Sequence, residues 1–213
     1  MSITKFIDYL AKEKKYSPHT ITAYSKDLSL FSAFCADEFD ESTIDHIDYP
    51  LIRSWIVSLV ESGKSNRTIN RKISVLRSYY NFLLRVEVRD TNPLRKHTPL
   101  KETKKVQLPF TENEVSQLLN GDHFSNDYTG VLINTIIETL YCTGMRRAEL
   151  IQLQSNAVDF AAATLKVIGK RNKERIIPII PSLGEQLKRY RLAVQEKFSL
   201  EQSPFFFCTV KGD

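Results

Sequence analysis

Apolar residues recur at the spacing of one helix face through the first 85 residues. Steps of three and four residues bring side chains to one side of a helix, and they predict four helices here. Ser17-Pro18 places a capping hydroxyl before a proline at the first turn of the second helix, and Gly63 ends the third. The apolar stripes lie within residues 3–10, 21–31, 51–59 and 69–83. Together they predict a compact all-α domain over residues 1–89.

The helical pattern stops between residues 90 and 109. Three prolines interrupt it, and five basic residues between Arg95 and Lys105 accompany a single acid, Glu102. We interpret residues 90–109 as a basic interdomain linker and residues 110–213 as a second domain.

The second domain is expected to combine helices with a short sheet. Thr111 and Glu114 match a capping box, in which each side chain satisfies a backbone N–H of the other residue. Helices are expected to end at Gly121 and Gly144. Two β-rich runs at 164–168 and 175–179 predict a hairpin, in which Pro178 suits an edge strand. A helix with an apolar stripe is expected next, and then another strand at 203–207; the stripe consists of Leu183, Leu187, Tyr190 and Val194. The fold class is therefore mainly α, with an α+β second part that carries a small antiparallel sheet.

Charge and cysteine content narrow the functional classes. The formal net charge of +5 is concentrated near residues 64–77, 95–105 and 166–175, which favours a polyanionic partner. Three widely spaced cysteines provide neither a disulfide framework nor the ligand spacing of a zinc site, so no metal is expected. The first residues lack the apolar core of a signal peptide, and no apolar run approaches a membrane span of about 20 residues. We expect a cytoplasmic protein.

Two motifs carry candidate chemistry. The first is Thr143-Gly144-Met145-Arg146-Arg147-Ala148-Glu149-Leu150, in which a glycine-ended helix passes to a new helix through an arginine. The second is the basic hairpin turn from Gly169 to Arg175. Each motif taken singly also has a structural explanation. The first could be a helix corner with a solvated arginine, and the second could be an exposed turn made soluble by its charges.

The pair of motifs resembles the tyrosine recombinase family, which includes Xer proteins and phage integrases. Lys170 follows Arg146 by 24 positions, in the family's order. Upstream, SPHTITAYSKDL and SNRTINRKISVLRSYYNFLL are similar to the second and fourth helices of the family's core-binding (SAM-like) domain. The resemblance covers essentially all 213 residues and implies a clamp around double-stranded DNA, assembly with other recombinase protomers, and no cofactor.

The resemblance aligns Arg146 with the first catalytic arginine of the family and Lys170 with the lysine of its β-hairpin. A guanidinium suits the extra negative charge of a pentavalent phosphorus, and an ammonium can protonate the leaving 5′ oxygen. Glu149, three residues after Arg146, is either an acceptor that orients the guanidinium or a helix-surface carboxylate. Arg147 is expected to contact phosphate or to remain solvated.

The fourth helix is the main candidate for DNA contact. Its cationic and amide side chains are expected to point away from the apolar stripe, and no acidic residue lies between Lys64 and Arg85 to pair with them. A solvated face is the alternative to phosphate and groove contact. The full set of expected DNA-binding residues is Lys64, Arg67, Asn70, Arg71, Lys72 and Arg77, with Thr20, Arg147, Arg171 and Lys173.

The family's remaining catalytic residues have no counterpart in the sequence. None of the four histidines begins an HxxR motif, and the single tyrosine among the 67 residues after Arg146 is Tyr190, which lies on an apolar stripe. We therefore expect a chain that ends within the catalytic domain, binds DNA, and neither cleaves nor rejoins it. The alternative is a non-catalytic DNA-binding regulatory module derived from the recombinase fold.

Overall fold

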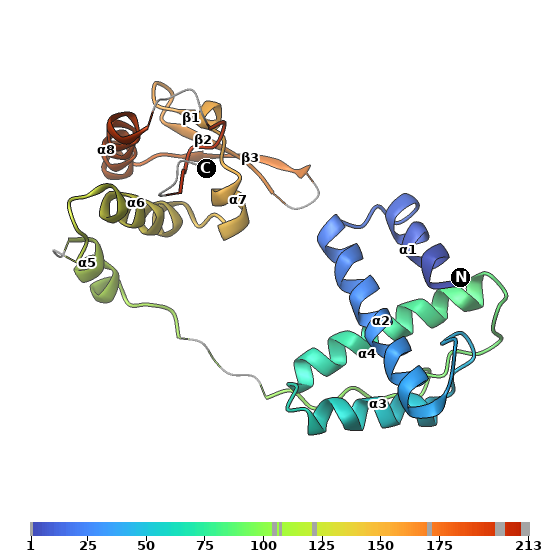
Figure 1. The fold of residues 1–213 in the computed structure, drawn as a ribbon. Coiled ribbons are helices and arrows are strands. Elements are labelled where there is room, and N and C mark those ends of the chain that lie inside the picture. The colour runs from blue at the N-terminus through green and yellow to red at the C-terminus, as the bar shows by residue number, and fades with distance from the viewer. Residues whose placement is uncertain are drawn as a thin grey trace. The chain divides into compact units, whose positions relative to one another are not determined.

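The computed structural model describes residues 2–103, 106, 108–120, 123–169, 172–198 and 203–209. The chain forms two compact units, Met1–Val106 and Gln107–Asp213 (Figure 1). As the sequence pattern predicts, the first is helical and the second adds a small antiparallel sheet. In the described part of the chain, no helix is long and apolar enough to cross a bilayer.

Unit 1 consists of α1 (Ser2–Lys12), α2 (Pro18–Phe39), α3 (Tyr49–Glu61) and α4 (Asn66–Arg85). The Ser17 hydroxyl accepts a hydrogen bond from the Thr20 N–H at 3.4 Å, which caps α2 where the Ser-Pro pair predicts it. Ser65 caps α4 through the Thr68 N–H at 3.3 Å. The expected apolar stripe of α4 is buried against the three other helices, and its members are Ile69, Ile73, Leu76, Tyr80 and Leu83.

The segment expected as a linker divides into two parts. Residues 90–102, here called the α4 strap, are part of unit 1 and pack on its helices, with the Leu94 side chain fully buried. The Asn66 amide donates to the Lys101 carbonyl at 2.8 Å, and Asn70 both donates to the Leu100 carbonyl and accepts from its N–H. Because these amide groups satisfy the backbone of the strap, the chain follows α4 instead of crossing freely to unit 2.

Unit 2 begins with α5 (Glu112–Asn120), which starts at the expected capping box: Thr111 Oγ1 accepts from the Glu114 N–H, and the Glu114 carboxylate accepts from the Thr111 N–H. The predicted end of this helix at Gly121 lies outside the described residues. Next come α6 (Tyr128–Thr143), α7 (Arg147–Ile151) and the short 3₁₀ turn η1 (Ser155–Ala157).

The sheet of unit 2 contains β1 (Val158–Asp159), β2 (Thr164–Ile168) and β3 (Glu174–Pro178), in the order β1-β2-β3 and antiparallel throughout. Pro178 lies on an edge strand, as expected. Helix α8 (Pro181–Lys197) packs against α6, and its expected stripe is buried together with Leu165 and Val167 of β2. The predicted strand at 203–207 is wrong: in the described part of the chain, this segment makes a single isolated bridge, between Phe205 and Gln154. The Phe205 N–H donates to the Ser203 hydroxyl instead of to a neighbouring strand.

Candidate functional site

The corner between α6 and α7 presents Arg146. Gly144 ends α6 in the left-handed conformation, with φ of 58°, and its N–H donates to the Leu140 carbonyl. Met145 is buried, which anchors the corner, whereas 69% of the Arg146 side chain is exposed. The local sequence therefore turns the chain sharply and leaves the Arg146 guanidinium at the surface.

Glu149 holds that guanidinium from within the protein. Its side chain is only 4% exposed, and it accepts from Arg146 Nη1 at 2.9 Å and from the Arg146 backbone N–H at 2.8 Å. The same carboxylate accepts from both terminal nitrogens of Arg175 on β3, at 2.9 and 2.8 Å. The hydrogen bonds from Arg175 are the main cause of a fall in the Glu149 pKa to about 2, although burial opposes it. Of the two expectations for Glu149, a surface carboxylate is wrong.

The hairpin turn approaches the same carboxylate closely. A Cβ at Gly169 would lie 3.1 Å from Glu149 Oε1, so only glycine fits here without displacing a neighbour. The Gly169 N–H donates to the Lys173 carbonyl at 2.7 Å, and the Lys173 side chain is exposed. Lys170 and Arg171 lie outside the described residues, so their expected roles remain predictions.

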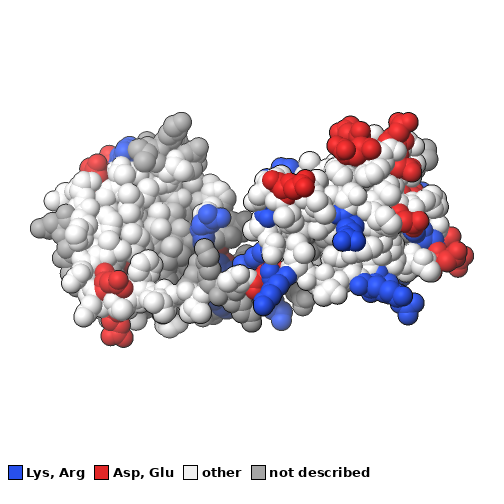
Figure 2. All heavy atoms as spheres, turned by 90° about the horizontal axis from the view of Figure 1, so that it is seen from below, with Lys and Arg blue, Asp and Glu red and all other residues white. Residues whose placement is uncertain are grey.

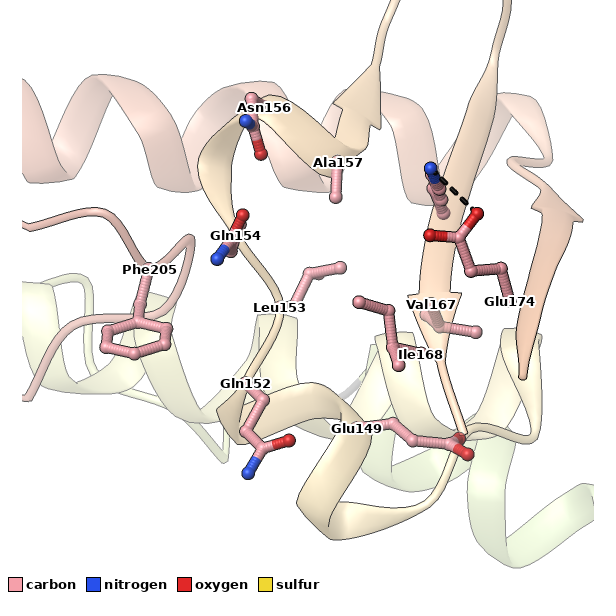
Figure 3. Close-up of a pocket in the computed structure, with 11 residues that line it drawn as sticks. Glu149, Gln152, Leu153, Gln154, Asn156, Ala157, Val167, Ile168, Glu174 and Phe205 are labelled. Atoms are coloured by element: carbon pink, nitrogen blue, oxygen red, sulfur yellow. Dashed lines mark ion pairs between the residues drawn. The ribbon is translucent and has the colours of Figure 1, made fainter. Parts of the chain in front are cut away.

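A pocket of about 540 Å³ lies beside this cluster, between the α7–η1 connection and the hairpin strands (Figure 3). Glu149 lies at its edge, and the Lys166–Glu174 ion pair, 2.9 Å long, lines one wall. Arg146 is not among the lining residues. The exposed guanidinium therefore does not belong to this hollow.

The expected DNA-binding residues of α4 fall on different faces of the helix. On the faces visible in Figure 2, Lys and Arg are scattered among uncharged residues. The exposure and the contacts of each residue therefore indicate which of them can bind DNA. Lys64, Arg67 and Arg71 are exposed. Arg67 and Arg71 are four residues apart and therefore share one side of the helix. Arg147 on unit 2 is likewise exposed.

Lys72 does not face solvent, and this part of the prediction is wrong. Its side chain is 8% exposed, and Nζ lies 2.7 Å from the carboxylate of Asp27 on α2 and 5.9 Å from the ring centroid of Trp55. Arg71 also pairs with Asp27. The acidic partner that α4 lacks within its own sequence therefore comes from another helix.

Three other candidates on unit 1 already have partners within the protein. Asn70 binds the α4 strap through Leu100 and also donates to Glu102 at 2.9 Å. Arg77 donates to the His97 carbonyl at 3.1 Å. The Thr20 hydroxyl lies 2.9 Å from the Ser17 hydroxyl at the start of α2. These three side chains therefore already have partners within unit 1, and their contact with DNA stays a prediction.

Tyr190 is a core residue, as its position on the α8 stripe predicts. It is fully buried, its hydroxyl accepts from the Cys208 N–H at 2.9 Å, and Tyr128 lies 3.3 Å away, oxygen to oxygen. Burial raises the pKa of this hydroxyl well above its usual range, so the nucleophilic phenolate is disfavoured.

Sequence reasoning missed Arg175 and Asp27. The sequence places Arg175 only within the basic hairpin, because nothing local connects it with Glu149, 26 residues earlier. Asp27 had a detectable signal: it lies three residues after Tyr24 and four before Phe31, within the apolar stripe of α2. Among the described residues, no cluster of histidine, cysteine and acidic side chains could hold a metal ion.

Comparison with known proteins identifies the family. Residues 3–87 match the phage integrase N-terminal SAM-like domain, and residues 109–211 match the phage integrase family. A tyrosine recombinase XerC of Bacillus licheniformis is 33% identical over 213 residues, which cover 99% of this chain and 69% of that protein. The chain belongs to the tyrosine recombinase family.

Other tyrosine recombinases and integrases show the same relationship. A tyrosine recombinase XerC of Pediococcus pentosaceus is 33% identical over 196 residues, which cover 92% of this chain; the match spans 65% of that relative, just under two thirds of its length. The Tn1549 transposon integrase, solved in complex with transposon right end DNA, superposes with a TM-score of 0.73 at 17% identity, over 100% of this chain and 72% of that one. The integrase fold is thus present in both units.

Proposed function

We propose that this chain binds double-stranded DNA and contributes two charged groups, Arg146 and Lys170, to the strand cleavage and rejoining of a site-specific recombinase. The observation that carries the proposal is the Arg146 guanidinium, which is 69% exposed yet fixed by a buried carboxylate at 2.9 Å. A guanidinium held in one orientation can stabilise the charge that develops on the non-bridging oxygens of a pentavalent phosphorus.

Glu149 serves in this proposal as a positioning residue. It shares its carboxylate between Arg146 and Arg175, so one anion fixes two cations that come from α7's N-terminus and from β3. Lys170 follows Gly169, the residue in close approach to Glu149. Its proposed task, protonation of the leaving 5′ oxygen, comes from the family resemblance.

DNA binding is assigned first to the exposed cations: Lys64, Arg67 and Arg71 of unit 1, and Arg147 and Lys173 of unit 2, with Arg171 by the family resemblance. Phosphate contacts of this kind release counterions, so affinity should fall steeply with salt. Lys72 is not included because its charge is buried against Asp27. Other recombinase protomers and a cytoplasmic site of action belong to the same proposal.

The test measures binding of the 213-residue protein to duplex DNA by fluorescence anisotropy over a range of salt concentrations. Arg67→Ala should weaken binding and lower the slope of log Kd against log salt by about 0.9. Arg53→Ala is the matched control, because Arg53 is also exposed but lies on α3. Equal effects of the two substitutions would show that only net charge matters and would remove α4 from the interface.

These 213 residues are proposed to bind DNA without cutting it. They contain no HxxR motif, and Tyr190, the only tyrosine after Arg146, is buried. A nicked suicide substrate should therefore yield no covalent protein–DNA adduct; an adduct would contradict this part. An in-frame HxxR and tyrosine downstream in the gene would favour the enzyme, and a stop codon after Asp213 would favour a non-catalytic regulatory module.

A further inference from the structure

A buried carboxylate on α2 holds two cations of α4. The Asp27 side chain is 4% exposed, and its two oxygens accept from both terminal nitrogens of Arg71 and from Lys72 Nζ. Lys72 is 8% exposed, but 51% of the Arg71 side chain is open to solvent. The same anion is therefore shared between one buried cation and one accessible cation.

This division leaves the positive charge of the cluster on Arg71. The buried Lys72 balances Asp27, so the cluster as a whole keeps a net charge of one cation, and that cation is the exposed guanidinium. Pairing with Asp27 uses two of the five N–H donors of Arg71. Asp27 is its only hydrogen-bond partner among the described residues, which leaves three donors for a ligand outside.

Resting on the proposed DNA binding, we propose that Asp27 is a positioning residue that fixes Arg71 for contact with a DNA phosphate, while Lys72 cancels the repulsion that Asp27 would otherwise exert on the DNA. A free arginine must lose rotamer freedom when it binds, whereas a guanidinium anchored through two hydrogen bonds has already lost it. Arg67, four residues earlier on the same exposed side of α4, has no such anchor among the described residues and contacts phosphate as a mobile cation.

The proposal makes a prediction opposite in sign to simple electrostatics. An acidic residue next to DNA repels phosphate, so its removal alone should strengthen binding. If Asp27 positions Arg71, its removal instead weakens binding. The two effects separate cleanly in the double variant Asp27→Asn/Lys72→Met, which removes one negative and one positive charge and leaves the net charge of the protein unchanged.

The experiment compares duplex DNA binding of the wild type, Arg71→Ala, Asp27→Asn/Lys72→Met, and the triple variant that combines all three changes. The charge-neutral double variant should bind more weakly than the wild type with its salt slope nearly unchanged, because Arg71 keeps its charge and loses only its fixed orientation. Arg71→Ala should lower the slope by about 0.9, as for the loss of one phosphate contact. In the Arg71→Ala background the same two changes should have no further effect. Circular dichroism confirms that each variant is folded at the temperature of the assay.

Three results would overturn the proposal. The double variant could bind like the wild type while Arg71→Ala binds more weakly, which means that Arg71 finds its phosphate unaided. Asp27→Asn/Lys72→Met could weaken binding as much in the Arg71→Ala background as in the wild type, which would mean that these two changes act on the structure of unit 1 and not through Arg71. Arg71→Ala could leave binding unchanged while Arg67→Ala lowers it; the proposed DNA binding would then stand without this contact. A wild type that binds no duplex at low salt would remove the proposed function itself.

Discussion

The ion cluster of Asp27, Arg71 and Lys72 predicts an asymmetry in stability that can be measured. Asp27→Ala removes the carboxylate and leaves the Lys72 ammonium buried at 8% exposure without its counterion. Breaking a buried ion pair in this way costs about 3–5 kcal/mol, a large share of a domain stability of about 5–15 kcal/mol. Lys72→Met should cost less, because Asp27 keeps Arg71 as a partner.

The decisive comparison is the variant that carries both changes. Asp27→Ala/Lys72→Met buries no unpaired charge, and replacing a buried pair by apolar groups is often close to neutral. The double variant should therefore be more stable than Asp27→Ala alone, although it carries one more substitution. Independent sites would show the opposite order, since their costs add.

Urea unfolding followed by tryptophan fluorescence measures this directly. Trp55 is the only tryptophan of the chain, is 3% exposed, and lies in the core of unit 1, so its signal reports that unit alone. The midpoints at equal m-values give the differences in unfolding free energy. A cost below about 1 kcal/mol for Asp27→Ala, or a double variant that equals the sum of the single ones, would refute the reasoning.

Three further predictions concern unit 2. The pKa of Glu149 is lowered in the folded state from 4.5 to about 2, so its carboxylate stabilises the fold above pH 4.5 and loses this effect as the pH falls toward 2. The difference in stability between the wild type and Glu149→Gln, measured by thermal unfolding at several pH values, should therefore shrink as the pH falls through that window. A difference that stays constant with pH would contradict the assignment. Tyr190→Phe should cost about 1–3 kcal/mol in urea unfolding, because the buried Cys208 N–H loses its acceptor; an unchanged midpoint would argue against that hydrogen bond. Gly169→Ala places a Cβ 3.1 Å from a Glu149 oxygen and should lower the melting temperature, whereas Gly184→Ala, with its nearest neighbour at 3.6 Å, should not; equal effects would contradict the close approach.

The helices were predictable because their signals are local. Apolar spacing and capping residues act within a few positions, so the Ser17 cap and the buried stripe ending at Leu83 could be located from the sequence. The strand expected at 203–207 is wrong because strand pairing depends on residues far away in the sequence. A run of phenylalanines indicates that a segment is buried, but it does not show whether a partner strand is available.

The contacts that organise the candidate site join residues far apart in the sequence. Glu149 and Arg175 belong to separate elements, and only the fold of the hairpin over α7 brings them together. Lys72 shows where a long-range contact does leave a trace. It follows Ile69 by three residues and precedes Leu76 by four, which is core spacing, and a charged residue at core spacing requires an opposite charge in a facing helix.

The α4 strap changes the length of the tether between the two units. A linker over residues 90–109 would contain 20 residues, with a reach of roughly 70 Å when fully extended. Because side chains of α4 bind the strap as far as Glu102, only the eight residues 103–110 remain before the capping box at Thr111, and their reach is at most roughly 29 Å. If both units bind one DNA site as proposed, a shorter tether raises the effective concentration of the second unit once the first is bound, so the hydrogen bonds that Asn66 and Asn70 make to the strap would add to avidity.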